Sequence, residues 1–442
     1  MHLPKAAALA VALTSAAPAH AFCGFFVGKA DTQLFNQSSQ VAIVRDQNRT
    51  VITMGNDYRG QLTEFALVVP VPSVLTREQI HLGEPALLKR LDGYSAPRLV
   101  EYTDEDPCER RRYEAMDAMP TTAARGGAMS MMQPAPKKAL GVTVEAEYTV
   151  GEYDIVLLSA TESEGLEIWL RESGYKMPPR AAAALSPYVK QQMKFFVAKV
   201  NLKEQQKAGF QELRPIQIAF ESPKFMLPIR LGMANADGPQ DLIVYAITRN
   251  GRVESSNYQT VKMPADVEVP EFVQREFGPF YKDTFGKAWR DHGKNALLTE
   301  YVWNMGSCDP CAAPPLASEE LRALGVFWLD EQPGAYHGGG MPLTLTRLHV
   351  RYDAQHFPED LMFQETGDQA PFQGRYVLRH PFRGETSCAA GREYKKQLEA
   401  RHREEAKTLA ALTGWELSRI HAGMGKDAPQ EPKPAWWKSL WK

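Results

Sequence analysis

Two of the five cysteines, Cys308 and Cys311, form a C-x-x-C pair that encloses Asp309 and Pro310. Cysteines at this spacing can act as a thiol-disulfide redox couple, supply half of a metal site, or serve as structural sulfurs. The residues around the pair, and the elements that carry it, decide among these three chemistries.

The flanking sequence argues against a reactive couple. A thioredoxin-like site lies between a strand and a helix, because the helix N-terminus lowers the pKa of the first thiol. A strand over 297–303 and a helix over 318–324 fit that order. However, two prolines soon after Cys311 disfavour a helix through that residue. The negative charge of Asp309 also disfavours ionisation of a neighbouring thiol to a thiolate. We therefore predict a structural clamp, with a redox couple as the alternative.

A metal site is not favoured by the sequence. Zinc needs four ligands, which usually come as a second C-x-x-C or a pair of histidines. The other cysteines are isolated along the chain: Cys23, Cys108 and Cys388. Three methionines offer thioethers suited to Cu(I): Met129, Met131 and Met132. Because Ala, Gly, Pro and Thr surround them without apolar periodicity, we predict a disordered Met-rich loop over 114–141 and no cofactor.

The odd number of cysteines leaves one without an intrachain partner. A Cys23–Cys108 bond would close a long loop and stabilise the fold by roughly 4 to 5 kcal/mol in the chain-entropy model. Cys388 is a candidate partner for Cys308 or Cys311. The sequence does not decide among these pairings.

The first residues predict export. Lys5 precedes an apolar run over 6–13, and Ala19 and Ala21 supply the small residues that signal peptidase requires. We therefore expect a signal peptide over 1–21, cleaved after Ala21, and a periplasmic or secreted protein. No later stretch approaches the roughly 20 apolar residues of a membrane span.

Charge and the C-terminal tail bear on partners. With 51 Lys and Arg against 53 Asp and Glu, the net charge is −2, so no nucleic-acid partner is expected. The segment 425–442 is a Pro-rich linker that ends in an aromatic and cationic tail. The tail residues are Trp436, Trp437, Trp441, Lys438 and Lys442. Such a tail fits peripheral contact with a membrane interface or docking on a partner, or it frays as a free terminus.

These residues must be positioned by strands and helices, and the pattern of those elements predicts an α+β fold with mostly antiparallel sheets, hairpins and several packed helices. The N-terminal part, 22–113, is β-rich. It contains a hairpin with strands at 41–45 and 50–54, and then a buried strand at 64–71. A helix is predicted over 77–91.

An α+β body over 142–388 follows the Met-rich loop. Strands are predicted at 142–150, 225–231 and 242–248, and Asn250-Gly251 after the last of them is typical of a hairpin turn. A highly charged C-terminal helix over 389–424 completes the folded part.

Two further patterns do not complete a site. His337 begins an H-G-G-G run that is similar to the oxyanion-hole segment of lipases and esterases, but the chain has no G-x-S-x-G nucleophile motif. The acidic residues 104–106 lack the D-x-D-x-D-G spacing of a calcium loop. We expect a glycine-rich turn and a solvated charged loop at these places.

Several phrases occur in order along the chain: Phe22–Phe25, Thr53–Tyr58, Phe65–Pro72, Tyr94–Leu99, Asp104–Cys108, Cys308–Cys311 and Phe372–Tyr376. Together they resemble a bacterial family known as domain of unknown function 2330. The resemblance covers nearly the whole mature chain and implies an exported bacterial protein. It implies no activity, substrate or fold.

The sequence thus favours an exported envelope protein that is not an enzyme. We expect a disulfide-supported body that binds or scaffolds an unidentified envelope protein or ligand, because no catalytic constellation assembles from the motifs. The alternative is a thiol-disulfide redox or metal-handling protein that uses Cys308 and Cys311.

Overall fold

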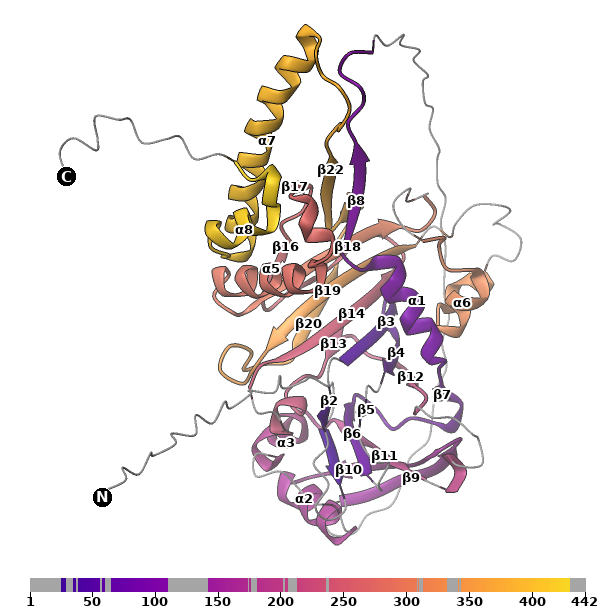
Figure 1. The fold of residues 1–442 in the computed structure, drawn as a ribbon. Helices are drawn as coiled ribbons and strands as arrows, with labels where there is room; N and C mark the ends of the chain where they lie inside the picture. The colour runs from indigo at the N-terminus through magenta and orange to yellow at the C-terminus, as the bar shows by residue number, and fades with distance from the viewer. Residues whose placement is uncertain are drawn as a thin grey trace, which may run out of the picture.

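A computed structural model shows how the chain folds (Figure 1). It describes residues 25–28, 35–36, 39–55, 58–59, 65–109, 142–173, 175, 181–201, 203–205, 213–235, 238–307, 309, 313–331, 341 and 343–429. The signal peptide, the Met-rich loop and the Trp and Lys tail predicted from the sequence lie outside these residues.

The largest sheet has nine strands among the described residues and is mostly antiparallel. Its order is β16 (Gln259–Lys262), β18 (Ala296–Asn304), β19 (Thr344–Tyr352), β14 (Gln240–Thr248), β3 (Ser39–Asp46), β4 (Arg49–Gly55), β12 (Ile216–Glu221) and β7 (Ile80–Leu82), with β21 (Phe372–Gln373) beside β18. Two pairs in it are parallel, β14 with β3 and β16 with β18. The β3–β4 pair confirms the predicted hairpin.

A second, antiparallel sheet of five strands packs against the first. Its order is β1 (Phe25–Gly28), β6 (Phe65–Val71), β11 (Lys194–Val200), β10 (Tyr153–Ala160) and β9 (Val142–Val150). Leu67 and Val69 of β6 face Val41 and Ile43 of β3 in the core between the sheets. The helices α2 (Ser163–Glu172) and α3 (Ala181–Lys190) cover the other face of this sheet.

Smaller sheets surround this pair of sheets. One contains β13 (Met226–Leu227), β20 (Leu361–Glu365) and β15 (Val253–Ser255), and another pairs β2 (Phe35–Asn36) with β5 (Tyr58–Arg59). The third is parallel and contains β17 (Val267–Val269), β22 (Arg375–His380) and β8 (Arg98–Thr103). The described elements therefore form an α+β fold with mostly antiparallel sheets, as predicted.

Helices cover the outer face of the nine-stranded sheet and the parallel sheet. They are α1 (Pro85–Ser95), α5 (Phe277–Asp291), α6 (Ser318–Ala323), α7 (Ala389–Thr413) and α8 (Leu417–Met424). The described residues also contain short 3-10 turns: η1 (Arg77–Gln79), η2 (Gly232–Asn235), η3 (Glu271–Gln274), η4 (Phe327–Glu331) and η5 (Gly425–Asp427). Among the described helices, none combines the length and apolarity that a membrane span requires.

Three predicted elements differ from the structure. The helix expected over 77–91 is instead η1, then β7, and then α1, which begins at Pro85 because proline suits the first helical turn. The single C-terminal helix is divided into α7 and α8, because Gly414 adopts a left-handed conformation (φ 76°) that ends α7. The strand over 225–231 is reduced to β13, since Pro228 cannot donate to a ladder.

The hairpin predicted at Asn250-Gly251 is also wrong. β14 pairs with β19 and β3, whereas β15 pairs with β20 in another sheet. Gly251 is required for a different reason: a Cβ placed there would lie 2.3 Å from the carbonyl oxygen of Thr366. The glycine therefore permits close backbone approach.

The N-terminal strands are not a separate unit. β3 pairs with β14, β4 with β12, and β6 with β11, so strands of the 22–113 part complete both large sheets together with strands of the 142–388 body. The predicted boundary at the Met-rich loop divides the sequence but not the sheets.

Candidate functional site

A disulfide joins Cys108 to Cys388, with the sulfurs 2.18 Å and the Cα atoms 6.1 Å apart. This bond rules out both a Cys23–Cys108 bond and a bond from Cys388 to Cys308 or Cys311. The physical reason is the parallel pairing of β8 with β22. The carboxyl ends of parallel strands meet at the same edge of a sheet, and the two cysteines follow those ends.

Further contacts hold the same junction together. Cys388 is the N-cap of α7, where its sulfur accepts a hydrogen bond from the Gly391 N–H at 3.1 Å. Asp104, just after β8, accepts one from the Tyr394 hydroxyl at 2.6 Å and forms an ion pair with Arg401 at 2.7 Å. The disulfide and these contacts fasten the start of α7 to the end of β8.

The other predicted site residues lie outside the described part of the chain: Cys23, Cys308, Cys311, Met129, Met131, Met132, Trp436, Trp437, Trp441, Lys438 and Lys442. Asp309, between the two cysteines of the C-x-x-C pair, is described. Its carboxylate accepts hydrogen bonds from the Tyr301 hydroxyl at 2.9 Å and from the Gln373 amide at 2.8 Å. The acid that follows Cys308 is thus held against β18 and β21.

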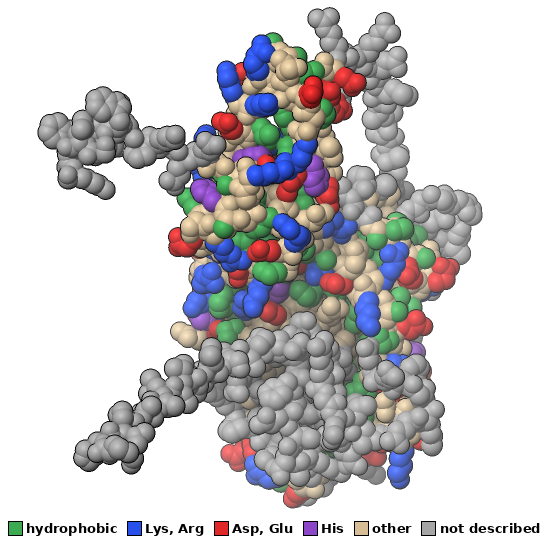
Figure 2. Space-filling model, in the orientation of Figure 1, with side chains coloured by type: hydrophobic (Ala, Val, Ile, Leu, Met, Phe, Trp, Pro, Cys, Tyr) green, Lys and Arg blue, Asp and Glu red, His purple; other side chains and the backbone are tan. Residues whose placement is uncertain are grey.

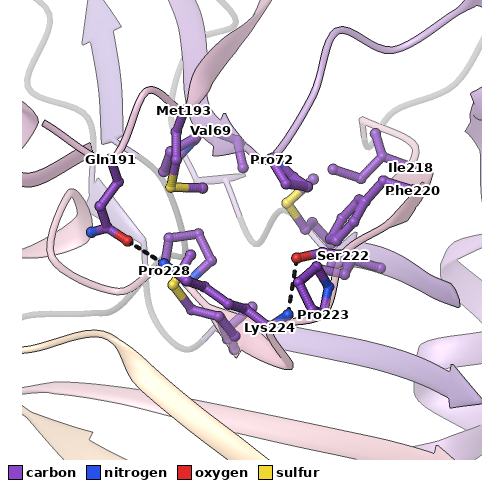
Figure 3. A pocket seen from close by; sticks show the side chains of 15 residues that line it. Val69, Pro72, Gln191, Met193, Ile218, Phe220, Ser222, Pro223, Lys224 and Pro228 are labelled. Atoms are coloured by element: carbon purple, nitrogen blue, oxygen red, sulfur yellow. Dashed lines mark hydrogen bonds between the residues drawn. The ribbon is translucent and has the colours of Figure 1, made fainter. Parts of the chain in front are cut away.

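The structure does contain a cavity that the sequence analysis did not anticipate. This apolar pocket, of about 180 Å³, lies where the nine-stranded and five-stranded sheets meet the segment between β12 and β13 (Figure 3). Its lining residues are Ile52, Met54, Val69, Pro70, Pro72, Gln191, Met193, Ile218, Phe220, Ser222, Pro223, Lys224, Met226, Leu227 and Pro228.

The pocket has an apolar floor and a polar rim. Met54, Ile218 and Met193 are buried in the floor, and methionine side chains adapt readily to the shape of an apolar guest. At the rim, the exposed Lys224 donates a hydrogen bond from Nζ to the Gln191 side-chain oxygen at 2.8 Å. Among the described residues, no carboxylate lies within ion-pair distance of this ammonium group.

Prolines explain why the cavity exists. Pro70, Pro72, Pro223 and Pro228 line it, and a proline has no N–H with which to extend a sheet. Pro70 still lies in β6, opposite Phe195 of β11, but Pro72, Pro223 and Pro228 cannot donate a hydrogen bond to a further strand over the apolar floor. The spacing of these four prolines near buried strands is the one sequence signal that could have indicated the pocket.

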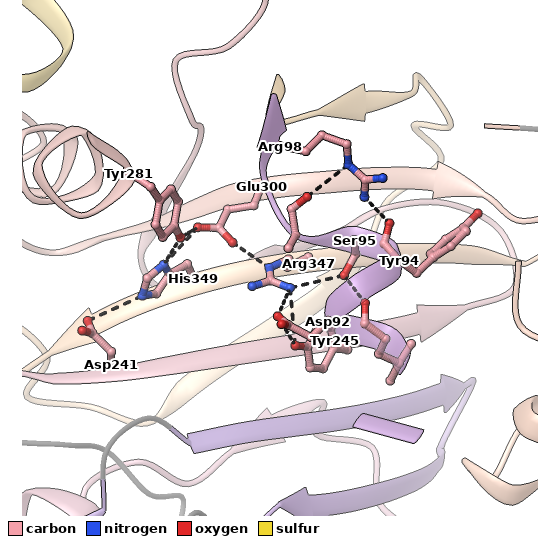
Figure 4. Close-up of polar contacts among 12 residues, drawn as sticks. Asp92, Tyr94, Ser95, Arg98, Asp241, Tyr245, Tyr281, Glu300, Arg347 and His349 are labelled. Carbon is pink, nitrogen blue, oxygen red and sulfur yellow. Dashed lines mark hydrogen bonds and ion pairs between the residues drawn. The ribbon is translucent and has the colours of Figure 1, made fainter. Parts of the chain in front are cut away.

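A second set of polar groups is buried rather than accessible. On the outer face of the nine-stranded sheet, Glu300 of β18 bonds to Arg347 Nε at 2.7 Å and to His349 Nδ1 at 3.0 Å, both on β19 (Figure 4). The Tyr281 hydroxyl of α5 donates to the same carboxylate. Arg347 continues to Asp92 of α1 at 2.7 Å.

The charges in this network stabilise one another. Burial alone would raise the pKa of Glu300, but the positive charges of His349 and Arg347 lower it to about 2. Burial opposes protonation of His349, yet Glu300 and Asp241 raise its pKa above the usual value. Glu300 has no exposed surface, so a substrate cannot reach it in this structure. The network joins α1 and α5 to the sheet.

The geometry offers no evident metal centre. Within the described ranges, no group of three or more His, Cys, Asp or Glu side chains is arranged to hold a metal ion. An accessible feature with a defined chemistry among the described residues is the apolar pocket with Lys224 at its rim.

The fold and the pocket together define a disulfide-bonded α+β protein with an apolar cavity between two sheets. Residues 17–364 match the model of the family described as uncharacterized protein conserved in bacteria (DUF2330), and the chain belongs to this family. This match confirms the resemblance found in the sequence. Comparisons with curated proteins and with solved structures gave no match. The apolar pocket lies wholly within the matched residues.

Proposed function

We propose that this is an exported bacterial envelope protein that binds a ligand and catalyses no reaction. The observation that carries the proposal is the position of Lys224 at the rim of an apolar cavity, where this cation has no carboxylate partner among the described residues. Binding sites combine an apolar surface with a few polar groups that orient the ligand. An anionic molecule with an apolar group matches both parts of the pocket.

The size of the cavity limits the ligand. Its volume of about 180 Å³ is below the roughly 300–1,000 Å³ of sites for drug-sized ligands. A short apolar group fits, whereas a whole lipid does not. We therefore assign to the pocket the apolar end of a short-chain or medium-chain carboxylate, with the carboxylate paired to Lys224.

Export is the second part of the proposal and rests on the leader over 1–21. The Cys108–Cys388 bond supports it, because disulfides persist in oxidising compartments such as the periplasm. Mass spectrometry of the protein recovered from the periplasm of a bacterial host should show an N-terminus at Phe22. Recovery of the uncleaved chain in the cytoplasm would contradict this part.

Ligand binding is tested by titrating the purified protein with octanoate in a calorimeter. We expect saturable binding that the Lys224→Gln variant weakens by about tenfold, because the charge-assisted contact is lost. Met226→Trp should abolish binding, since Met226 lines the pocket and is only half-buried, so the larger ring can fill the cavity. Lys396→Gln, an exposed lysine of α7, is the matched control.

Two results would overturn the binding proposal. One is the absence of octanoate binding to the native protein, and the other is equal binding by the native protein and by both pocket variants. Circular dichroism of each variant must show the native spectrum, so that lost binding is not confused with lost folding.

The alternative function is thiol-disulfide exchange at Cys308 and Cys311. One observation favours it: Cys388 is bonded to Cys108 and is no longer available to either cysteine. A Cys308–Cys311 bond that mild dithiothreitol reduces would support this alternative. A bond from either cysteine to Cys23, resistant to the same treatment, would exclude it.

A further inference from the structure

A second cavity lies at the opposite end of the molecule from the apolar pocket. This polar pocket, of about 310 Å³, lies between η3, the end of β22, one face of α7, and the α8–η5 segment. Its lining residues are Pro270, Glu271, Phe272, Gln274, Arg275, Arg379, His380, Arg383, His402, Glu405, Gly423, Met424, Lys426 and Asp427. The two pockets share no residue, so a ligand here is independent of the function proposed above.

Part of the charge in the polar pocket is already compensated. Arg383 bonds through Nη2 to Glu271 at 3.0 Å and to Asp427 at 3.0 Å, and His380 Nδ1 contacts Glu271 at 2.9 Å. Arg379 is paired with Glu268 at 2.8 Å. These contacts use the accessible carboxylates and fix the walls of the cavity.

Two cations are left over. Arg275 and Lys426 are exposed at the rim, and among the described residues no carboxylate lies within ion-pair distance of either side chain. Figure 2 shows basic and acidic side chains intermixed over the visible surface of α7 and its neighbours. The excess of positive charge is therefore found at the rim of the pocket and not across this whole surface. An anion that entered the cavity would meet these two unpaired cations.

The inner wall carries two titratable groups one helical turn apart on α7. His402 is 9% exposed, and none of the hydrogen bonds found in the described part of the structure involves its ring. Glu405 is 4% exposed and lies 3.5 Å from Arg401. The ring nitrogens of His402 are not among the fully enclosed polar atoms that lack a partner, so they face the cavity and are open to a ligand there.

We infer that the polar pocket binds a small oxyanion through Arg275 and Lys426, with the His402 ring as a further donor. The shared chemistry is that of a carboxylate or a phosphate group, which accepts hydrogen bonds from guanidinium, ammonium and imidazole groups. The cavity admits a compact anion together with a few water molecules, because water occupies about 30 Å³ per molecule in the liquid.

The affinity should depend on pH. Burial raises the pKa of Glu405 to about 7, so this carboxyl loses its negative charge as the pH falls through neutrality. Burial lowers the pKa of His402 below its usual value. The charged groups that face them are Arg401 on α7, Asp104 after β8, Glu268 on β17, Glu271 on η3, Arg383 after β22 and Asp427 on η5. Since Glu405 repels an anion when ionised, binding should strengthen toward lower pH.

The test uses calorimetry on the full-length protein with inorganic phosphate and, separately, with citrate. We expect saturable binding of one or both anions. Phosphate and citrate themselves titrate near neutral pH, so the effect of Glu405, whose pKa is about 7, is measured by comparing the native protein with Glu405→Gln at each pH. Arg275→Gln and Lys426→Gln should each weaken binding by about tenfold. Glu405→Gln should bind each anion more tightly than the native protein does above pH 7 and about equally well below it, because the two differ in charge only where Glu405 is ionised. Lys396→Gln, which removes a lysine of α7 outside the pocket, should bind as the native protein does.

Three results would overturn the inference. They are no binding of either anion at millimolar concentration, unchanged binding by the Arg275→Gln and Lys426→Gln variants, or an equal loss in Lys396→Gln. Both substituted rim residues are exposed, so their variants should retain the fold, which circular dichroism checks independently.

Discussion

Glu300 is a charged residue with no exposed surface, and an irregularity of the backbone accounts for its position. The register between β18 and β19 shifts between Thr299 and Tyr301, which gives Glu300 no partner of its own in the β18–β19 register. Such a bulge redirects a side chain. The carboxylate can then reach both Arg347 and His349.

We predict that Glu300→Gln lowers the free energy of unfolding by about 3 to 5 kcal/mol, because Arg347 and His349 lose the buried carboxylate that they share and Arg347 keeps the more exposed Asp92. The native protein should lose the same contribution in acid. The pKa of Glu300 is about 2 in the fold against 4.5 for a free glutamate. Its stabilisation is therefore complete above pH 4.5 and decreases as the pH falls toward 2.

Urea unfolding at several pH values measures this effect. Glu399→Gln, at an exposed position of α7, is the matched control and should change stability by no more than about 0.5 kcal/mol. An equal loss in both variants, or native stability in Glu300→Gln, would show that the network does not stabilise the fold.

At the scale of elements, local sequence patterns were sufficient to predict individual strands but not to predict which strands pair. The strands β3, β4, β6 and β14 were predicted, because an alternating or continuous run of apolar residues indicates burial from a few neighbouring residues alone. The prediction of an Asn-Gly hairpin was wrong because Gly251 instead permits close backbone contact with residues 366–368, which lie far along the chain. No local pattern shows which strand lies beside another, so the parallel β8–β22 pair, the disulfide and the polar pocket could not be predicted. The prolines beside buried strands were the only local sign of the apolar pocket.

Gly251 and Gly278 test two different effects of glycine, namely close approach to another backbone segment and low helix propensity. Gly251→Ala should destabilise the protein by about 1 to 3 kcal/mol, because the new Cβ would lie 2.3 Å from a backbone oxygen. Gly278→Ala, in α5, should stabilise it by about 0.5 to 1 kcal/mol, since nothing lies within 4 Å and alanine favours a helix. Thermal unfolding of both variants tests these opposite signs. A rise in Tm for Gly251→Ala would contradict the account given for the failed hairpin.

At the scale of the molecule, the disulfide spans 280 residues of sequence. We predict that the double variant Cys108→Ser/Cys388→Ser loses up to about 5 kcal/mol of stability in the chain-entropy model. The loss should be concentrated where α7 meets β8, so hydrogen exchange of α7 should increase more than that of β14. Peptide mapping of the native protein should recover a Cys108–Cys388 pair. An equal increase of hydrogen exchange in α7 and β14 would show that the disulfide stabilises the whole protein rather than the junction of α7 with β8.

The parallel pairing of β3 with β14 also determines when folding can finish. β3 lies in the interior of the nine-stranded sheet, yet one of its two neighbours is not synthesised until Gln240–Thr248 has been made. Until then the β3–β4 hairpin exposes an apolar strand edge, which is a template for association with other chains. Contacts between such distant segments also slow folding. The chain is therefore most exposed to aggregation in the interval before β14 joins β3.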